Sequence, residues 1–571
     1  MVVEHLDDLP LIGHNIETTG IPSLFDAHFP DHGLWSGLSG GKVVAGWLSY
    51  ILTEGDHRLS HVEGWAASHL NCLAVTLDAP GIRSVDFCDD KLGRLLDRIA
   101  VDDAWKNFEH ELGRHIIHVY RPVGEQVDTV AQVVRADAFN VPQFREVGEL
   151  FRHGYSKQRR DDLPFCKVMV GYLDGLAMPL TADVVKGSGP DYEHYLPTIN
   201  RIRDMLGNEG NLYVADSNMG SVGNRSAIQA SGNFYLCPLN SKQIVKEKEV
   251  AYFDLLPCAP GELPGLFIGA DEKRDPVHYF ELTERAFDGE REWVERRILI
   301  YSPSYAQGLH KSFNNRLDEA EEQIRNLVVF KRGRRNPKTM QDLHERIGVI
   351  SKKYDVEGCL EVKCSEENTT VNVQKHKDRP ARAVITSSLS LTVSRDEVQI
   401  GKRLQSMGWQ IYGSNAPREL FSTAHLVEIY RDQYSIEHLF DFFLNRDTGL
   451  LPVYLKKEYR VKALIRLLSL AMKCSMLIQY KVRAELKAKA GEIKGVYAGN
   501  KNRKTNKPTT PMLLSAFKGI SIVCVSPEED PSFRMVSLND TQRYILELTG
   551  VPQLYARVAE HLKTHAILSE T

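Results

Sequence analysis

The stretch 127–216 constrains the fold most, because strand patterns and a helix pattern alternate within it. Three apolar runs typical of strands lie at 127–137 (VDTVAQVVRAD), 164–185 and 211–216 (NLYVAD). Asp174 and Gly175 predict a hairpin turn inside the second run. The segment 191–207 has helical spacing and ends in glycine. A strand, a hairpin and a helix that leads back to another strand predict an α/β layer.

The regions on either side of this layer have other patterns. Residues 1–120 and 419–480 carry apolar residues at the spacing of helices. The region 240–410 is mixed, without a repeat, and contains one charged helix predicted over 304–330. Residues 481–507 contain nine Lys or Arg against two Glu, and AGNKNRKTNKPTTP (498–511), which begins within this basic stretch, predicts an exposed loop or linker.

Length and composition limit the class of protein. A chain of 571 residues is too long for one ordinary core, so several domains are expected. Hydrophobic residues make up 42% and charged residues 26%, as in soluble globular proteins. The formal net charge of −4 gives no global sign of a nucleic-acid partner. Such a partner would have to be bound by local basic surface.

The sequence favours a cytoplasmic protein. The most apolar helical segment, 461–480, is interrupted by Lys462, Arg466 and Lys473, which favours a buried amphipathic helix over a membrane span. The N-terminus lacks the layout of a secretory signal. The nine cysteines form no CxxC pair, which is typical of reduced thiols.

Two predicted strands end on an aspartate, Asp137 and Asp216. If the strands are neighbours, their carboxyl ends bring these side chains together at one edge of the sheet. Any strand that leaves a core also needs a polar terminus, so the pair alone leaves a purely structural role open.

A third carboxylate strengthens the functional interpretation. In the predicted helix 425–447, Tyr430, Gln433, Glu437 and Leu444 share one face, and an adjoining apolar face would dock the helix onto the sheet. Docking would turn Glu437 toward the two aspartates. Three converging carboxylates form a hard-oxygen site for Mg²⁺ or Mn²⁺. Two such ions about 4 Å apart support phosphodiester chemistry.

Further motifs follow this layout in a specific order. A stretch of the form G-x-S-K-x-x-R-x-D-L fits Gly154, Ser156, Lys157, Arg160, Asp162 and Leu163. GWQIYGSN precedes the glutamate helix, and LPVYLKKEYRVKALIRLLSLAM follows it. With these motifs, the chain resembles the DDE transposases of bacterial insertion sequences, in the branch with a large insertion before the glutamate and a Tyr-x2-Arg-x3-Glu-x6-Lys signature.

The resemblance implies an α/β fold with an RNase H-like catalytic core, interrupted by a mixed insertion domain and preceded by a helical domain. The implied domains are 1–120 (helical, DNA-binding), 125–240 (first part of the core), 241–410 (insertion), 411–480 (second part of the core) and 481–571 (basic linker and C-terminal helical element).

The resemblance also implies roles for single residues. Asp137, Asp216 and Glu437 would be the catalytic acids and would bind the metal, Mg²⁺ or Mn²⁺ as two ions. Tyr430 matches the signature tyrosine, whereas Gln433 and Leu444 stand at the signature arginine and lysine positions. The residues expected to grip DNA are Lys157, Arg160, Tyr430, Arg431 and Arg446.

The resulting hypothesis is a DNA transposase that cleaves transposon ends and transfers the freed strand into target DNA. It would act as a homodimer on double-stranded DNA, in the nucleoid. The basic runs 331–338 and 481–507 become candidates for phosphate contact. The alternatives are a catalytically inactive DNA-binding descendant and a metal-dependent nuclease without strand transfer.

Overall fold

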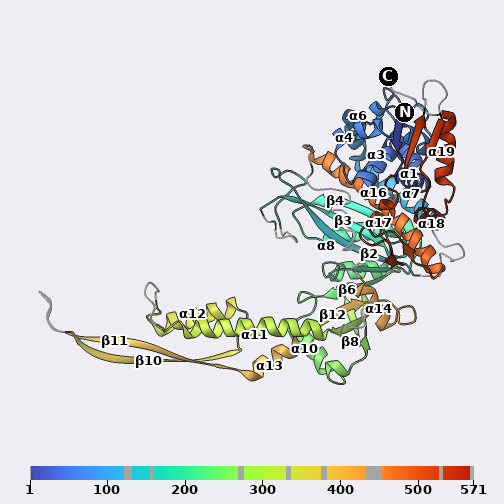
Figure 1. Cartoon of the computed structure of the whole chain (residues 1–571). Helices are drawn as coiled ribbons and strands as arrows, with labels where there is room; N and C mark the ends of the chain where they lie inside the picture. The colour runs from blue at the N-terminus through green and yellow to red at the C-terminus, as the bar shows by residue number, and fades with distance from the viewer. Residues whose placement is uncertain are drawn as a thin grey trace. The chain divides into compact units, whose positions relative to one another are not determined.

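The computed structural model describes the chain except for residues 1, 121–130, 155–159, 161, 268–275, 330–335, 374–381, 433–452, 454, 526–531 and 566–571. It divides into two compact units (Figure 1). The first comprises Met1–Pro238, Arg285–Glu295 and Gly413–Thr571, and the second comprises Leu239–Glu284 and Arg296–Tyr412. Within the described residues, no helix is both long enough and apolar enough to cross a membrane.

Five strands of the first unit form the predicted α/β layer. Their order is β4-β3-β2-β5-β6, with bounds Met178–Lys186, Phe165–Leu173, Val133–Pro142, Leu212–Ala215 and Phe234–Leu239. The β3–β4 hairpin turns at Asp174–Leu176, where the sequence predicts it. Strand β2 is antiparallel to β3 and parallel to β5. All residues of β3 and β5 are buried, as expected for apolar strands inside a covered sheet.

Helices α8 (Tyr192–Leu206) and α16 (Glu458–Ala488) pack against this sheet. Gly171 in β3 permits the close approach of α8, because a Cβ atom at this position would lie 2.1 Å from Cδ1 of Ile202. Helix α9 (Val222–Ala230) follows β5, and α14 (Thr423–Arg431) precedes the segment 433–452.

The charges that interrupt the apolar pattern of α16 are paired with helix α7 (Asp102–Tyr120). Lys462 and Arg466 each lie 2.5 Å from Asp102, and Lys473 lies 3.5 Å from Glu109. These ion pairs explain how a largely buried helix carries three cations, since buried charges need partners. They also join helix α7 to helix α16, which packs against the sheet.

The two ends of the described chain form one module. Strand β1 (Val2–His5) pairs with β15 (Ser521–Val525), which pairs with β16 (Ser532–Met535). The remaining N-terminal helices are α1 (Leu9–Thr18), α2 (Ile21–His28), α3 (Gly40–Glu54), α4 (Leu59–Ala67), α5 (Leu70–Thr76) and α6 (Asp89–Ile99). The C-terminal elements are β13 (Ile493–Lys494), β14 (Lys504–Thr505), α17 (Thr510–Ser515), α18 (Asp540–Leu548) and α19 (Leu554–His565).

The second unit contains a mixed set of elements and a long two-stranded ribbon. Its strands β12 (Trp409–Ser414), β9 (Glu292–Tyr301), β8 (Val277–Phe287) and β7 (Gly265–Leu266) lie in that order, the first three extending partly into the other unit's ranges. Its helices are α10 (Lys246–Asp254), α11 (Pro303–Arg325), α12 (Met340–Lys353) and α13 (Glu397–Ser406). Helix α11 is the charged helix that the sequence predicts over 304–330.

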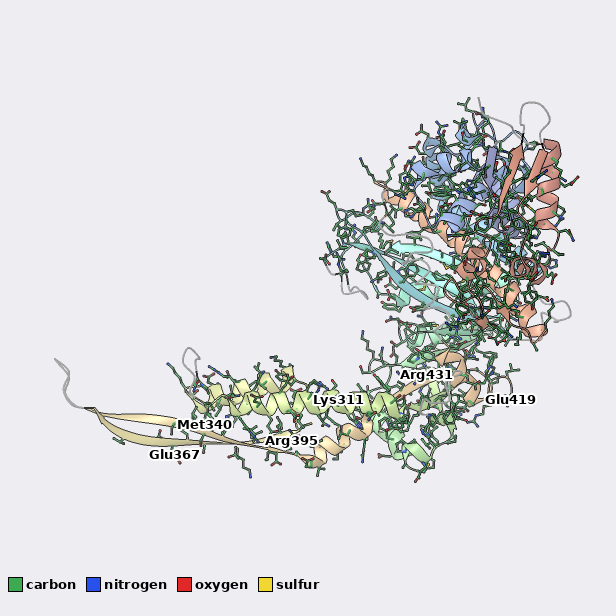
Figure 2. All side chains as sticks on the ribbon, viewed as in Figure 1. Lys311, Met340, Glu367, Arg395, Glu419 and Arg431 are labelled. Carbon is green, nitrogen blue, oxygen red and sulfur yellow. The ribbon has the colours of Figure 1, made fainter. Side chains whose placement is uncertain are left out.

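The ribbon consists of β10 (Leu360–Val373) and β11 (Arg382–Arg395), paired along their whole length. Helices α11 and α12 lie along it (Figure 1). Arg395, labelled in Figure 2, forms ion pairs with Asp318 (2.5 Å) and Glu321 (2.8 Å) of α11. A two-stranded ribbon needs such support, because an isolated hairpin is marginally stable.

Candidate active site

The register of two parallel strands brings Asp137 and Asp216 together. In the β2–β5 pair, Ala136 lies opposite Ala215, and the two aspartates occupy the next position on each chain. Both side chains are half-buried. The two carboxylates are therefore neighbours at the edge where β5 ends.

The prediction that the first strand ends on Asp137 is wrong. Strand β2 continues for five residues to Pro142, because its second half stays paired with β3 down to Phe165. Strand β5 does end at Ala215, directly before Asp216. At the two aspartates, therefore, β5 ends whereas β2 continues.

A tyrosine that the sequence does not single out contacts Asp216. Tyr195 of α8 is fully buried, and its hydroxyl donates a hydrogen bond of 2.6 Å to Oδ1 of Asp216. Burial raises the pKa of Tyr195 well above its usual value, and the charges of Asp216 and Asp137 raise it further. The tyrosine therefore stays protonated and remains a donor. In the sequence, the only feature that could have pointed to Tyr195 was its place on the predicted helix between two strands.

The other donors to Asp216 come from Asn218. The backbone N–H of Asn218 donates to Oδ1 (2.9 Å) and its side-chain amide donates to Oδ2 (3.0 Å). Among the described residues, Asp216 is thus held by uncharged donors. In this described part of the chain its negative charge is oriented but has no cationic partner.

A buried polar network fixes the loop that follows Asp216. Arg225 donates from Nε to the carbonyl oxygen of Gly220 (3.0 Å) and forms an ion pair with Glu295. Glu295 also accepts from the hydroxyl of Tyr235 (2.5 Å), which accepts from the indole N–H of Trp293 (2.8 Å). This network stabilises the loop after Asp216 through the backbone of Gly220.

Helix α14 ends near the same sheet. Tyr430 and Arg431 are its last two residues, both half-buried (Arg431 in Figure 2). Burial raises the pKa of Tyr172 in β3, and the charges of Asp174 and Asp432 raise it further. Asp432 therefore acts on a strand that is paired with β2, since Tyr172 lies opposite Arg135.

Four sequence-predicted site residues need separate mention. Glu437, Arg446 and Lys157 lie outside the described residues, whereas Arg160 lies inside them. In the part of the chain that the structure describes, no three metal-ligating side chains are grouped. The third acid of the proposed site therefore stays a prediction.

Arg160 lies beside an unusually exposed aromatic ring. Its guanidinium forms an ion pair of 2.8 Å with Asp162 and lies 5.6 Å from the ring centre of Phe144. Phe144, two residues beyond β2, is 81% exposed. The following segment is anchored on α16, because the N–H groups of Glu149 and Leu150 donate to one carboxylate oxygen of Glu458, each at 2.9 Å.

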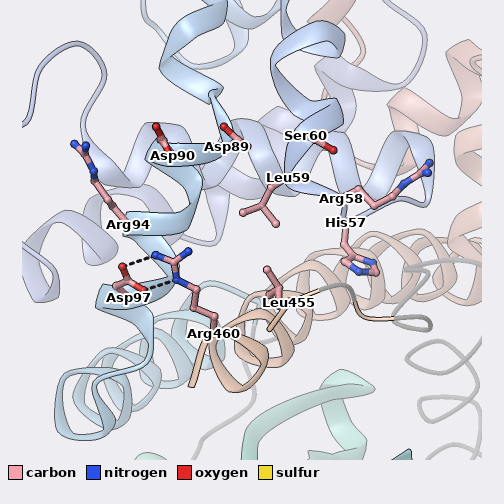
Figure 3. A pocket seen from close by; sticks show the side chains of 10 residues that line it. All are labelled: His57, Arg58, Leu59, Ser60, Asp89, Asp90, Arg94, Asp97, Leu455 and Arg460. Atoms are coloured by element: carbon pink, nitrogen blue, oxygen red, sulfur yellow. Dashed lines mark hydrogen bonds and ion pairs between the residues drawn. The ribbon is translucent and has the colours of Figure 1, made fainter. Parts of the chain in front are cut away.

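A pocket of about 780 Å³ lies elsewhere in the first unit, among α4, α6 and the start of α16. Figure 3 shows Leu59 and Leu455 between His57 and the ion pair of Asp97 with Arg460 (2.6 Å). Neither Asp137 nor Asp216 lines it. Its acids and bases offset one another, so the pocket gives no charge signature of its own.

The comparison with protein families shows the family to which the chain belongs. Residues 129–474, more than half of the chain, match the family model described as "Transposase DDE domain". The chain belongs to the transposase DDE domain family. The resemblance to DDE transposases is confirmed at this level. The matched DDE domain begins just before β2, ends within α16 and includes Asp137, Asp216 and Glu437.

Other comparisons add little to this DDE assignment. A cryo-EM structure of a piggyBac transposase synaptic complex with hairpin DNA aligns at 10% identity with a TM-score of 0.25. The alignment covers 51% of this chain and 58% of that chain, just over half of its length. The search of curated proteins gives no match.

Proposed function

We propose that this DDE-family chain is a DNA transposase that cuts the ends of a mobile element and joins the freed 3′-hydroxyl to target DNA. The observation that carries the proposal is the β2–β5 register, which makes Asp137 and Asp216 neighbours inside the DDE match. Uncharged donors orient Asp216, so its charge remains available to a bound cation. The family match supports transposition as the biological activity.

Divalent metal ions fit the donor set. Asp137, Asp216 and Glu437 would hold Mg²⁺ or Mn²⁺, since carboxylate oxygens are the ligands that these hard cations prefer. When bound, two such ions activate the attacking oxygen and stabilise the leaving oxygen of a phosphodiester. The protein's own contribution is to orient the carboxylates: Tyr195 and Asn218 fix both oxygens of Asp216.

The finer features of the proposal come from the resemblance. The sheet unit would be an RNase H-like core, and residues 241–410 its insertion domain, as in insertion-sequence transposases with a Tyr-Arg-Glu-Lys signature. Lys157, Arg160, Tyr430, Arg431 and Arg446 would contact DNA near the cut phosphate. The helical N-terminal domain would recognise the element's end. The pairing of two ends would require a homodimer. The protein would act at the nucleoid.

Cleavage and joining should be measured separately with the full chain. The substrate is a duplex that carries the DNA on either side of the gene, where a transposon would have its inverted repeats, incubated with a supercoiled target plasmid, with and without Mg²⁺. We expect Mg²⁺-dependent cuts at the repeat and insertion of its 3′ end into the plasmid. Cuts without insertion would favour the plain nuclease.

Specific binding without cuts in either Mg²⁺ or Mn²⁺ would favour the inactive descendant. Gln433 and Leu444, at the signature Arg and Lys positions, are the sequence features on which that alternative rests. Neither position belongs to the proposed metal site.

A further inference from the structure

The basic stretch that the sequence presents as a linker is partly an ordered hairpin. Strands β13 and β14 pair with Ile493 opposite Thr505 and Lys494 opposite Lys504. The residues between them turn back on themselves, because the N–H of Gly495 donates to the carbonyl oxygen of Lys501 (3.1 Å). The preceding residues, up to Ala488, belong to helix α16. We call residues 493–507 the basic hairpin.

The basic hairpin is held firmly on the body of the first unit. Ile493 and Val496 are buried, at 1% and 3% exposure. Gly495 has φ +82°, and a Cβ atom there would lie 2.4 Å from Oγ1 of Thr541, so the hairpin fits closely against the start of α18. Thr541 also donates to the carbonyl oxygen of Lys494 (3.2 Å).

The far end of the basic hairpin is tied to α16. Arg483 donates from Nε to the carbonyl oxygen of Pro508 (2.9 Å) and from Nη2 to that of Lys507 (3.3 Å). The same arginine interacts electrostatically with Tyr172 of β3. Tyr172 lies opposite Arg135, two residues before Asp137. The hairpin is therefore anchored near the sheet that carries the acid pair.

All the cations of the basic hairpin point to solvent. Its exposed cationic residues are Lys494, Lys501, Arg503, Lys504 and Lys507. Within the described residues, none of them forms an ion pair with a carboxylate. Arg503 instead lies 4.2 Å from the ring centre of Tyr497, an arrangement that supports cation–π attraction and presents both groups to a ligand.

The placement of two lysines makes a purely structural role unfavourable. Lys494 and Lys504 are directly opposite each other across the strand pair. Like charges in such pairs destabilise a hairpin. An ordered, closely fitted element that concentrates unpaired cations in a chain of net charge −4 is suited to an anionic polymer.

We infer that the basic hairpin is a DNA-backbone-binding element of this transposase, separate from the acid pair. Lys494, Lys501, Lys504 and Lys507 contact phosphates, and Tyr497 with Arg503 packs against the sugar-phosphate edge. The inference rests on the proposed DNA substrate. It assigns the hairpin to affinity and positioning rather than to the chemical step.

The test compares two triple variants of the full chain with equal loss of charge. The hairpin variant is Lys501→Gln/Lys504→Gln/Lys507→Gln. The control is Lys352→Gln/Lys518→Gln/Lys563→Gln, at exposed lysines outside residues 493–507. Binding of a labelled mixed-sequence duplex of about 30 base pairs is followed by anisotropy between about 50 and 200 mM salt.

Each lost phosphate contact lowers the slope of log affinity against log salt by about 0.9. We expect the hairpin variant to lose two to three such contacts and about tenfold or more in affinity, while the control keeps the wild-type slope within about 0.5. Equal slopes in wild type and hairpin variant would overturn the inference and leave Mg²⁺-dependent cleavage intact. A wild-type chain that binds no duplex would overturn the proposed function as well.

A single substitution separates binding from folding. Lys504→Glu removes the like-charge pair with Lys494, so we expect an unchanged or higher Tm together with weaker duplex binding. Unchanged affinity at a higher Tm would show that the lysine pair does not contact DNA and would overturn the inference.

Discussion

Two sets of carboxylates in the first unit have opposite surroundings. At one edge, Asp216 receives only uncharged donors within the described residues, from Tyr195 and Asn218. On β4, Asp183 is paired with Arg201, which also pairs with Glu109 of α7. Within the described residues, Asp216 has no cationic partner, whereas Asp183 and Glu109 are paired with cations of the protein.

The surroundings of the second set show why it is structural. Glu109 is fully buried and lies 3.5 Å from the buried ammonium of Lys473 in α16, while the N–H of Ala182 donates to it (3.2 Å). Burial lowers the pKa of Lys473, and Glu109 opposes that shift. These contacts join α7, α16 and β4. These compensated carboxylates hold elements of the fold together.

The largest effect is expected from removing the charge of one of the three proposed catalytic acids. Asp137→Asn, Asp216→Asn and Glu437→Gln should each lower Mg²⁺-dependent cleavage by more than about a thousandfold, because an amide supplies no anionic oxygen to the metal. Duplex binding and Tm should change little, as measured by anisotropy and thermal melting. Asp204→Asn, at an exposed position in the last turn of α8, is the matched control. Wild-type cleavage by Asp216→Asn would refute the site.

This contrast was only half visible in the sequence. The aspartates after VVRA and LYVA could be identified because apolar runs define strands, and parallel neighbours share one edge. The continuation of β2 to Pro142 could not, since it depends on pairing with β3, a contact between distant segments. Tyr195 was hidden for the same reason. Its helix was predictable from periodicity, but the partner of its hydroxyl is set by packing.

The charges of α16 illustrate the same limit. Lys462, Arg466 and Lys473 predicted a buried amphipathic helix, and α16 is largely buried. Their partners on α7 required the fold. Residues 498–511 were expected as an exposed loop or linker, because the charge of the basic run 481–507 does not reveal that Ile493 and Val496 are buried.

The second largest effect should follow from breaking the compensated set. Glu109→Gln leaves Arg201 and Lys473 without their shared buried counter-charge, which should destabilise the fold by about 3 kcal/mol. The measurement is chemical denaturation, with Glu111→Gln as control. Glu111 is on the same helix and pairs with His28 at an exposed position, where a loss below about 1 kcal/mol is expected. A Glu109→Gln variant as stable as the control would show that the network is not structural.

A smaller effect tests how Asp216 is oriented. Tyr195→Phe removes the hydroxyl that donates to Asp216 but keeps the ring in the core. Cleavage should fall about tenfold, with a higher Mg²⁺ requirement, because groups that orient metal ligands have effects of this size. Raising the Mg²⁺ concentration should restore part of the rate. A lower rate that no Mg²⁺ concentration improves would instead point to a general loss of packing.

The smallest effect concerns a third kind of carboxylate, which is buried and hydrogen-bonded to a hydroxyl. Asp8 is 3% exposed and accepts a hydrogen bond from Thr53 (3.0 Å). Burial, with the nearby charges of Asp7 and Glu54, raises its pKa to about 7. The unfolded value is about 3.9, so between these pH values the folded chain keeps a proton that the unfolded chain has lost. Asp8 therefore favours the folded state less as pH rises from about 4 to 7.

Asp8→Asn removes this dependence, because the amide keeps the acceptor for Thr53 and cannot ionise. At about pH 8 the variant should be more stable than wild type, and near pH 4.5 the difference should be much smaller, because the unfolded carboxyl ionises from about pH 4 and the folded one only near pH 7. Thermal melting at both pH values checks this, and other titrating groups cancel between the two chains. An equal gap at both pH values would mean that Asp8 is ionised throughout. It would then belong with the compensated carboxylates, held by a partner other than Thr53.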